Sequence, residues 1–179
     1  MSVRELRTAH ETAATQDVAR HLRSFGVAAD NVRRGNPDQG EPDAIFDSAH
    51  RTLGIELTCV GYYERGSRDS DEFMRRSWGD LQDLLRVDGP TMLMGPELMN
   101  FDAVKTFAQS LLEQKCAKHY RVPTFLVICA VMGHVGLTTA DDGPAIVRDL
   151  RVPTGCPFER VYLRMQRNVT GEIVLFQVA

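Results

Sequence analysis

The sequence predicts an α/β fold in which a mixed central β-sheet is flanked by helices. Three observations lead to this prediction: an amphipathic helix opens the chain, two short strand-like runs follow it as a hairpin pattern, and a continuous apolar run follows a later helix. An apolar run rich in β-branched residues is typical of a strand buried on both faces, which a sheet between helical layers provides. We expect a single domain over residues 1–179, a length that can bury a substantial core.

The N-terminal third is predicted to hold one helix followed by three extended segments. Apolar residues recur near the helical period over 5–25, and Gly26 is a typical helix stop. Residues 27–34 are expected to be extended, and the Gly- and Pro-containing stretch 35–40 is expected to form a loop. The runs 41–47 and 53–60 then flank a short polar connection, which is the pattern of a β-hairpin.

The rest of the chain is predicted to continue with helices and strands. Helices are expected over 71–87 and 101–120, with an irregular stretch between them that includes a short strand at 91–94. The apolar run over 124–131 is the strand expected to be buried on both faces. Residues 133–157 are rich in Gly, Pro and Asp and are predicted to be irregular. Two strands at about 160–166 and 172–178, joined by a turn at 168–171, are expected to close the chain.

The composition narrows the class of protein. The chain is 43% apolar and 25% charged, and it has neither an apolar run of membrane-spanning length nor an apolar signal-peptide core at its N-terminus. We therefore expect a cytoplasmic protein with no membrane partner. The net charge of −3 argues mildly against a protein that coats nucleic acid non-specifically. Four cysteines without a CxxC pair are expected to be reduced, buried thiols: Cys59, Cys116, Cys129 and Cys156.

Two acidic residues are predicted to face each other across the hairpin. With Ser48 to Arg51 as the connection, Asp47 pairs with Thr52, and Asp43 then pairs with Glu56. Directly opposed residues have Cβ atoms about 4.5–5.5 Å apart on one face of the sheet, so the two carboxylates repel unless a cation lies between them. Mg²⁺ binds one or two carboxylates together with waters and phosphate oxygens. The alternative is that Glu56 lies on a solvent-facing sheet surface.

Charged residues on two helices are candidates to join this acidic pair. On the predicted helix 101–120, Lys115 falls near the centre of the apolar face and Lys118 on its flank, at about 100° per residue. An ammonium from either could stabilise a nucleophilic water or the charge that develops on a phosphate. Glu11 lies on the inward face of the first helix and could supply a third carboxylate. The alternatives are lysine stems that snorkel at a helix C-terminus and a solvated glutamate.

The motif around the hairpin resembles the PD-(D/E)XK nuclease superfamily. Pro42-Asp43, a short hairpin and then Gly54-Ile55-Glu56-Leu57-Thr58 follow its pattern, with Asp43 as the Asp and Glu56 as the (D/E). Thr58 stands where the lysine is expected. The sequence is similar to a branch with an E-x-T triplet and a lysine that has migrated to the following helix, a position that Lys115 matches. The resemblance implies a restriction-endonuclease-like three-layer fold, with a core over about 5–131 and closing strands within about 159–178.

The resemblance implies a Mg²⁺-dependent (or Mn²⁺-dependent) nuclease that acts on DNA rather than RNA. It assigns the metal to Asp43 and Glu56 with the Thr58 carbonyl or hydroxyl nearby, and catalytic support to Lys115, Lys118 and Glu11. Basic and aromatic residues over 62–78 could contact the nucleic-acid backbone or a splayed base. Such nucleases often act as dimers, so a homodimer is left open. The alternative is an inactive nuclease fold that serves as a nucleic-acid-binding or protein-interaction module, which the missing lysine at position 58 favours.

Overall fold

The computed structural model describes residues 3–24, 26–49, 51–59, 101–130, 140–166 and 172–178. The helix predicted at 71–87, the strand at 91–94, the basic and aromatic segment at 62–78 and the turn at 168–171 lie outside the described residues. Within them, the α-helices are α1 (Val3–Ser24), α3 (Phe101–Cys116) and α4 (Gly143–Asp149), with single 3-10 turns η1 (Pro37–Gln39) and η2 (Ala140–Asp142). No helix in this part of the chain combines the length and apolarity needed to cross a membrane.

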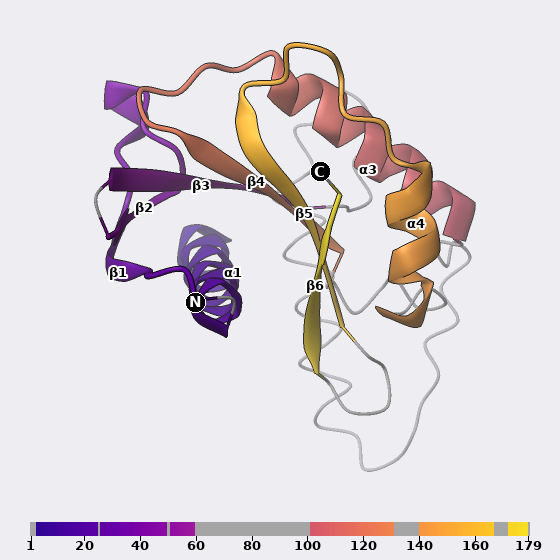
Figure 1. Cartoon of the computed structure of the whole chain (residues 1–179), viewed down its shortest axis with the longest axis horizontal. Helices are drawn as coiled ribbons and strands as arrows, with labels where there is room; N and C mark the ends of the chain where they lie inside the picture. Colours follow the sequence, from indigo (N-terminus) through magenta and orange to yellow (C-terminus); the bar gives the residue numbers. More distant parts are fainter. Residues whose placement is uncertain are drawn as a thin grey trace.

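A mixed six-stranded sheet forms the centre of the molecule (Figure 1). Its strands are β1 (Asp30–Arg34), β2 (Ala44–Ser48), β3 (Arg51–Cys59), β4 (Thr124–Ala130), β5 (Phe158–Gln166) and β6 (Ile173–Gln177), and they lie in chain order. Strands β3, β4 and β5 are parallel, whereas β1, β2 and β6 pair antiparallel with their neighbours. The predicted α/β class with a mixed sheet is confirmed.

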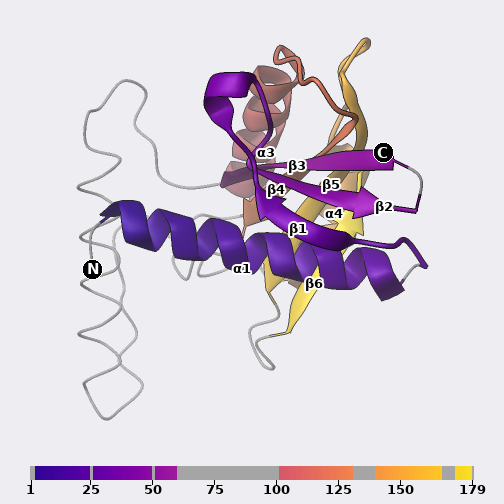
Figure 2. The same ribbon diagram turned by 90° about the vertical axis from the view of Figure 1, so that its left-hand side faces the viewer.

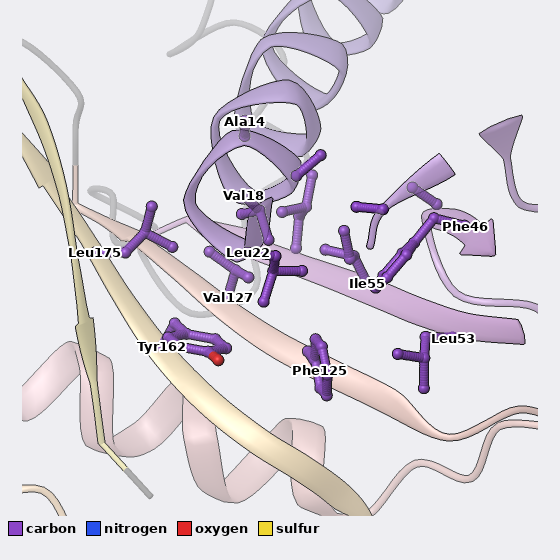
Figure 3. Packing of buried hydrophobic residues seen from close by; sticks show 14 of the residues in the cluster. Ala14, Val18, Leu22, Phe46, Leu53, Ile55, Phe125, Val127, Tyr162 and Leu175 are labelled. Atoms are coloured by element: carbon purple, nitrogen blue, oxygen red, sulfur yellow. The ribbon is translucent and has the colours of Figure 1, made fainter. Parts of the chain in front are cut away.

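Helices cover both faces of this sheet (Figures 1 and 2). Alternation along β4 explains why, since Leu126 and Ile128 pack with α3 and α4 while Phe125 and Val127 pack with α1. Every residue of β4 is buried, as the apolar run predicted. On the α1 side, Ala14, Val18 and Leu22 recur every four residues and contact the strands from one stripe of the helix (Figure 3).

Three local features differ from the sequence-based expectations. The stretch 133–157 was expected to be irregular, but it contains α4, a seven-residue helix that opens with Gly143 and Pro144 and buries Ile146. The helix expected to reach residue 120 ends at Cys116. Cys116 and Cys156 form a disulfide, so the expectation of reduced thiols is wrong for this pair. The fold brings the end of α3 beside the loop before β5. The sequence spacing of these cysteines does not indicate that contact.

Candidate metal centre

The β2–β3 hairpin sets the positions of the two candidate carboxylates. The predicted register is confirmed where strands pair, with Asp47 opposite Thr52 and Ile45 opposite Gly54. Ser48 also pairs with Arg51, so the connection is tighter than predicted. The ladder ends at the pair Ala44 and Ile55, one step before Asp43 and Glu56. The same register therefore puts these two acids opposite each other at the open end of the hairpin.

Asp43 is held where β2 begins by contacts to both neighbouring strands. Its backbone carbonyl accepts a hydrogen bond from Gly35 N at 3.0 Å, and its Oδ2 accepts one from Leu57 N at 2.7 Å. The β2–β3 ladder ends before Leu57, so no β2 carbonyl accepts a hydrogen bond from Leu57 N. The Asp43 carboxylate accepts this hydrogen bond instead. A carboxylate has about four acceptor sites, so this one bond leaves Asp43 able to bind a cation.

The glycine in the Gly54-Ile55-Glu56 stretch is required by a close approach of the Pro42 ring. A Cβ at Gly54 would lie 2.4 Å from Pro42 Cγ and 2.8 Å from Thr124 Oγ1, so no larger residue fits without a shift of its neighbours. The absence of a side chain at Gly54 thus makes room for Pro42 and for Thr124 of β4. The Pro-Asp and Gly-x-Glu elements of the motif are thus parts of one packed unit.

Glu56 is a buried charge in the middle of the sheet. It is 4% exposed, and its neighbours Ile55 and Leu57 point to the α1 face, so Glu56 points to the face that α3 covers. Lys115 Nζ lies 2.5 Å from Glu56 Oε1, and Lys118 Nζ lies 3.1 Å from the same oxygen. Both candidate lysines therefore reach this carboxylate, and the solvent-facing alternative for Glu56 is wrong.

The packing of α3 explains how its lysines reach the sheet. Val104, Ala108 and Leu112 are fully buried along one stripe of the helix, and Lys115 continues this stripe by one further step. The Lys115 side chain is 18% exposed, so its stem lies in the core while its ammonium meets Glu56. Lys118 follows the helix end in a turn closed by its own amide, which donates to the Lys115 carbonyl at 2.9 Å.

The charges in this cluster shift one another's pKa values. Burial raises the pKa of Asp43 to about 6, the carboxylates of Glu56 and Glu11 add to the rise, and the Leu57 amide and Lys115 oppose it. Burial acts in the same direction on Glu56, but its bonds to Lys115, Tyr120 and Lys118 outweigh burial and lower the pKa below its ordinary value. Both carboxylates are consequently ionised at neutral pH.

Tyr120 is a site residue that the sequence placed near the lysines without giving it a role. Its ring packs on Phe158 with centroids 5.8 Å apart, and its buried hydroxyl lies beside Glu56. Burial and the charge of Glu56 raise the pKa of this hydroxyl, so it stays protonated. The Tyr120 hydroxyl therefore adds a neutral donor beside the acidic pair.

Two further predicted residues lie at the edge of the cluster. Glu11 on α1 is close enough to Asp43 to contribute to its raised pKa, and it forms an ion pair with Arg34 at 3.4 Å. Thr58 lies two residues beyond Glu56 on the same face of β3, where it is partly buried and pairs with Ile128. Lys115 and Lys118 contact Glu56 directly, whereas Glu11 pairs with Arg34 and Thr58 follows Glu56 along β3.

The donor set of the cluster suits a hard divalent ion. Among the described residues no group of three or more His, Cys, Asp or Glu side chains could hold a metal, so the centre offers the two carboxylates of Asp43 and Glu56. Mg²⁺ is commonly held by one or two carboxylates and completes its shell with waters and phosphate oxygens, whereas a zinc site needs three or four side chains. The residues therefore fit Mg²⁺ or Mn²⁺.

Comparisons with known proteins leave this centre to be judged on its own geometry. The chain matches no model of a known protein family, no curated protein and no solved structure at a significant level.

Proposed function

We propose that this protein is a divalent-metal-dependent nuclease that hydrolyses phosphodiester bonds, with DNA as the first substrate to test. The observation that carries the proposal is Glu56, a buried carboxylate that meets two lysines on one oxygen and lies next to Asp43 on the hairpin. Buried ion pairs add little to stability compared with apolar packing of the same volume. A cluster of buried titratable groups, kept although it adds little to stability, is typical of a functional site.

In the proposed reaction Asp43 and Glu56 hold the metal, with Thr58 beside them and Glu11 at the edge. When bound, Mg²⁺ or Mn²⁺ would lower the pKa of a water molecule and neutralise charge on the attacked phosphate. Oδ2 of Asp43 is fixed by the Leu57 amide, and this bond orients the carboxylate before any ligand arrives. Fixed geometry of this kind lowers the cost of reaching the reactive arrangement.

Lys115 would supply the positive charge that the PD-(D/E)XK pattern expects from position 58. Its ammonium is already desolvated and lies 2.5 Å from Glu56, so it can hold the attacking water or stabilise charge on the phosphate. Lys118 is half exposed and lies 3.1 Å from the same oxygen, which suits contact with an incoming phosphate. The Tyr120 hydroxyl is a further donor for the same charge.

A binding module without cleavage is the second candidate, and one observation favours it. The two lysines already neutralise Glu56, so the fold can bury this carboxylate without any metal. In that case the protein would bind nucleic acid or another protein and would neither bind Mg²⁺ nor hydrolyse DNA. Metal binding and cleavage therefore separate the two candidates.

The test uses purified protein with single-stranded and double-stranded DNA and with RNA, each with Mg²⁺, Mn²⁺ or EDTA. Glu56→Gln and Lys115→Met are expected to lower the cleavage rate at least a hundredfold, a typical loss for a charge-stabilising group. Asp47→Asn is the matched control, because Asp47 is an exposed carboxylate on strand β2 of the same hairpin. Cleavage that survives Glu56→Gln unchanged would show that the nuclease site lies elsewhere. If the protein cleaves none of these substrates and binds no Mn²⁺ in calorimetry, the result favours the binding module.

A further inference from the structure

A cavity of about 160 Å³ lies beside Asp43, between the middle of α1 and strand β1. Figure 2 shows these two elements side by side. The helix contributes Glu11, Thr12 and Gln16 to its wall, and the strand contributes Val32 and Arg34. At about 30 Å³ per water molecule, the cavity is several times larger than one water needs. It therefore has room for a chemical group next to the proposed metal position.

The wall of the cavity combines cationic, polar and apolar surface. Arg34 offers a planar guanidinium that can bind a phosphate through two parallel hydrogen bonds. Thr12 and Gln16 add hydroxyl and amide groups, while Val32 and Ala44 add apolar surface. This mixture matches the sugar and phosphate of a nucleotide, which present an apolar ring edge and anionic oxygens together.

Arg34 is the arginine that could exchange partners. Its Nη2 lies 3.4 Å from Glu11 Oε2, and its side chain is 61% exposed, so this ion pair contributes little to stability. The neighbouring Arg33 donates two hydrogen bonds of 3.1 Å to Glu41 and is held in place. Glu11 lines the same cavity as Asp43, and its charge acts on that carboxylate. Arg34 and a bound cation would therefore compete for Glu11.

We propose that this cavity binds the sugar and phosphate of the nucleotide next to the cleaved bond, and that Arg34 leaves Glu11 for a phosphate oxygen when the metal binds. The inference rests on the proposed nuclease function and adds a substrate-positioning residue to it. It has an unusual consequence for one variant. Loss of the Arg34 charge removes the cation's competitor for Glu11 and also removes the anchor for the phosphate, so metal affinity and nucleic-acid affinity should change in opposite directions.

The experiment compares Arg34→Gln, Arg34→Lys and Arg20→Gln in the full chain. Arg20 is the matched control. It is an exposed arginine on α1, the helix that lines the cavity, and it pairs with Asp17 at 3.1 Å. Binding of a fluorescein-labelled single-stranded oligonucleotide is measured by anisotropy with Ca²⁺ in place of Mg²⁺, and the oligonucleotide is checked for integrity afterwards. Binding of Mn²⁺ alone is measured by calorimetry.

Arg34→Gln is expected to weaken oligonucleotide binding about tenfold, the usual loss for one charge-assisted contact, and to tighten Mn²⁺ binding. Arg34→Lys should fall between the wild type and Arg34→Gln, since it keeps the charge and loses the paired geometry. Arg20→Gln should change neither affinity. If the wild type binds Mn²⁺ and cleaves DNA while Arg34→Gln behaves like Arg20→Gln, or loses both affinities, the cavity proposal is overturned alone. A wild type that binds neither Mn²⁺ nor oligonucleotide overturns the nuclease proposal with it.

Discussion

Replacing Asp43 by asparagine should make the metal-free protein more stable at neutral pH. The pKa of Asp43 rises from an ordinary 3.8 to about 6 on folding, first because the carboxyl is buried and then because Glu56 and Glu11 repel its charge. A difference of about two units corresponds to about 3 kcal/mol of folding free energy. Asparagine removes the charge and keeps an oxygen for the Leu57 amide, so the substitution relieves this penalty.

The pH dependence has a defined sign and window. A carboxyl whose pKa is raised by folding adds stability that is fully present below about pH 4 and is lost as the pH rises through about 6. The wild type should therefore lose stability over this window, whereas Asp43→Asn should not lose this contribution. The advantage of the variant should grow by about 2 kcal/mol between pH 4.5 and 8, with most of the growth below pH 6.

Urea unfolding followed by far-UV circular dichroism measures this advantage. The samples contain EDTA, and wild type, Asp43→Asn and Asp47→Asn are compared at several pH values from 4.5 to 8. Asp47 is exposed and accepts a hydrogen bond from Asn31 at 2.9 Å, so its variant should stay within about 0.5 kcal/mol of the wild type. A variant Asp43→Asn that is less stable than the wild type at pH 8, or an advantage that does not change with pH, would refute the burial argument.

Three further predictions concern the metal, the ion pair and the disulfide. Mn²⁺ affinity measured by calorimetry should fall about tenfold per pH unit below pH 6, because only ionised Asp43 binds the cation; an affinity that is flat from pH 5 to 7.5 would exclude Asp43 as a ligand. Lys115→Met should cost about 2 kcal/mol of stability in EDTA, since Glu56 loses its buried cation and the remaining cation, Lys118, is half exposed. Added Mn²⁺ should restore much of this stability, which denaturant titrations with and without Mn²⁺ will show. Reduction of the Cys116–Cys156 disulfide, which spans 40 residues, should lower the free energy of unfolding by about 4 kcal/mol. Unfolding measured with and without a thiol reductant checks this value. A Cys156→Ser variant should show no change on adding the reductant.

The parts of the fold with a clear local pattern could be predicted from the sequence. The hairpin register followed from counting residues on either side of a polar connection, and the strand buried on both faces followed from the apolar run over 124–131. The helical angle predicted that Lys115 extends the apolar stripe of Val104 and Leu112, and the resemblance to the nuclease pattern directed it to Glu56, which it contacts. Whether these residues catalyse a reaction stays a prediction.

The features that the sequence did not indicate depend on contacts between distant segments. Helix α4 has seven residues, which is too short for a helical period to emerge, and it begins with the pair Gly143 and Pro144 that is typical of loops. The bond between Cys116 and Cys156 requires the end of α3 and the loop before β5 to meet. The pairing of Arg34 with Glu11 likewise joins β1 to α1, and only the folded chain shows that a cavity lies between them.

The two lysines on Glu56 give the site a simple charge balance. With Asp43 and Glu56 ionised, two negative and two positive charges cancel, so the protein's own charges at this centre sum to zero. A divalent cation alone would leave two positive charges in a partly buried place, and a phosphate alone would leave a negative one. Bound together they leave a single positive charge, half of what the cation leaves alone. We therefore expect metal and nucleic acid to bind cooperatively, each raising the affinity for the other by the same factor, as thermodynamic linkage requires.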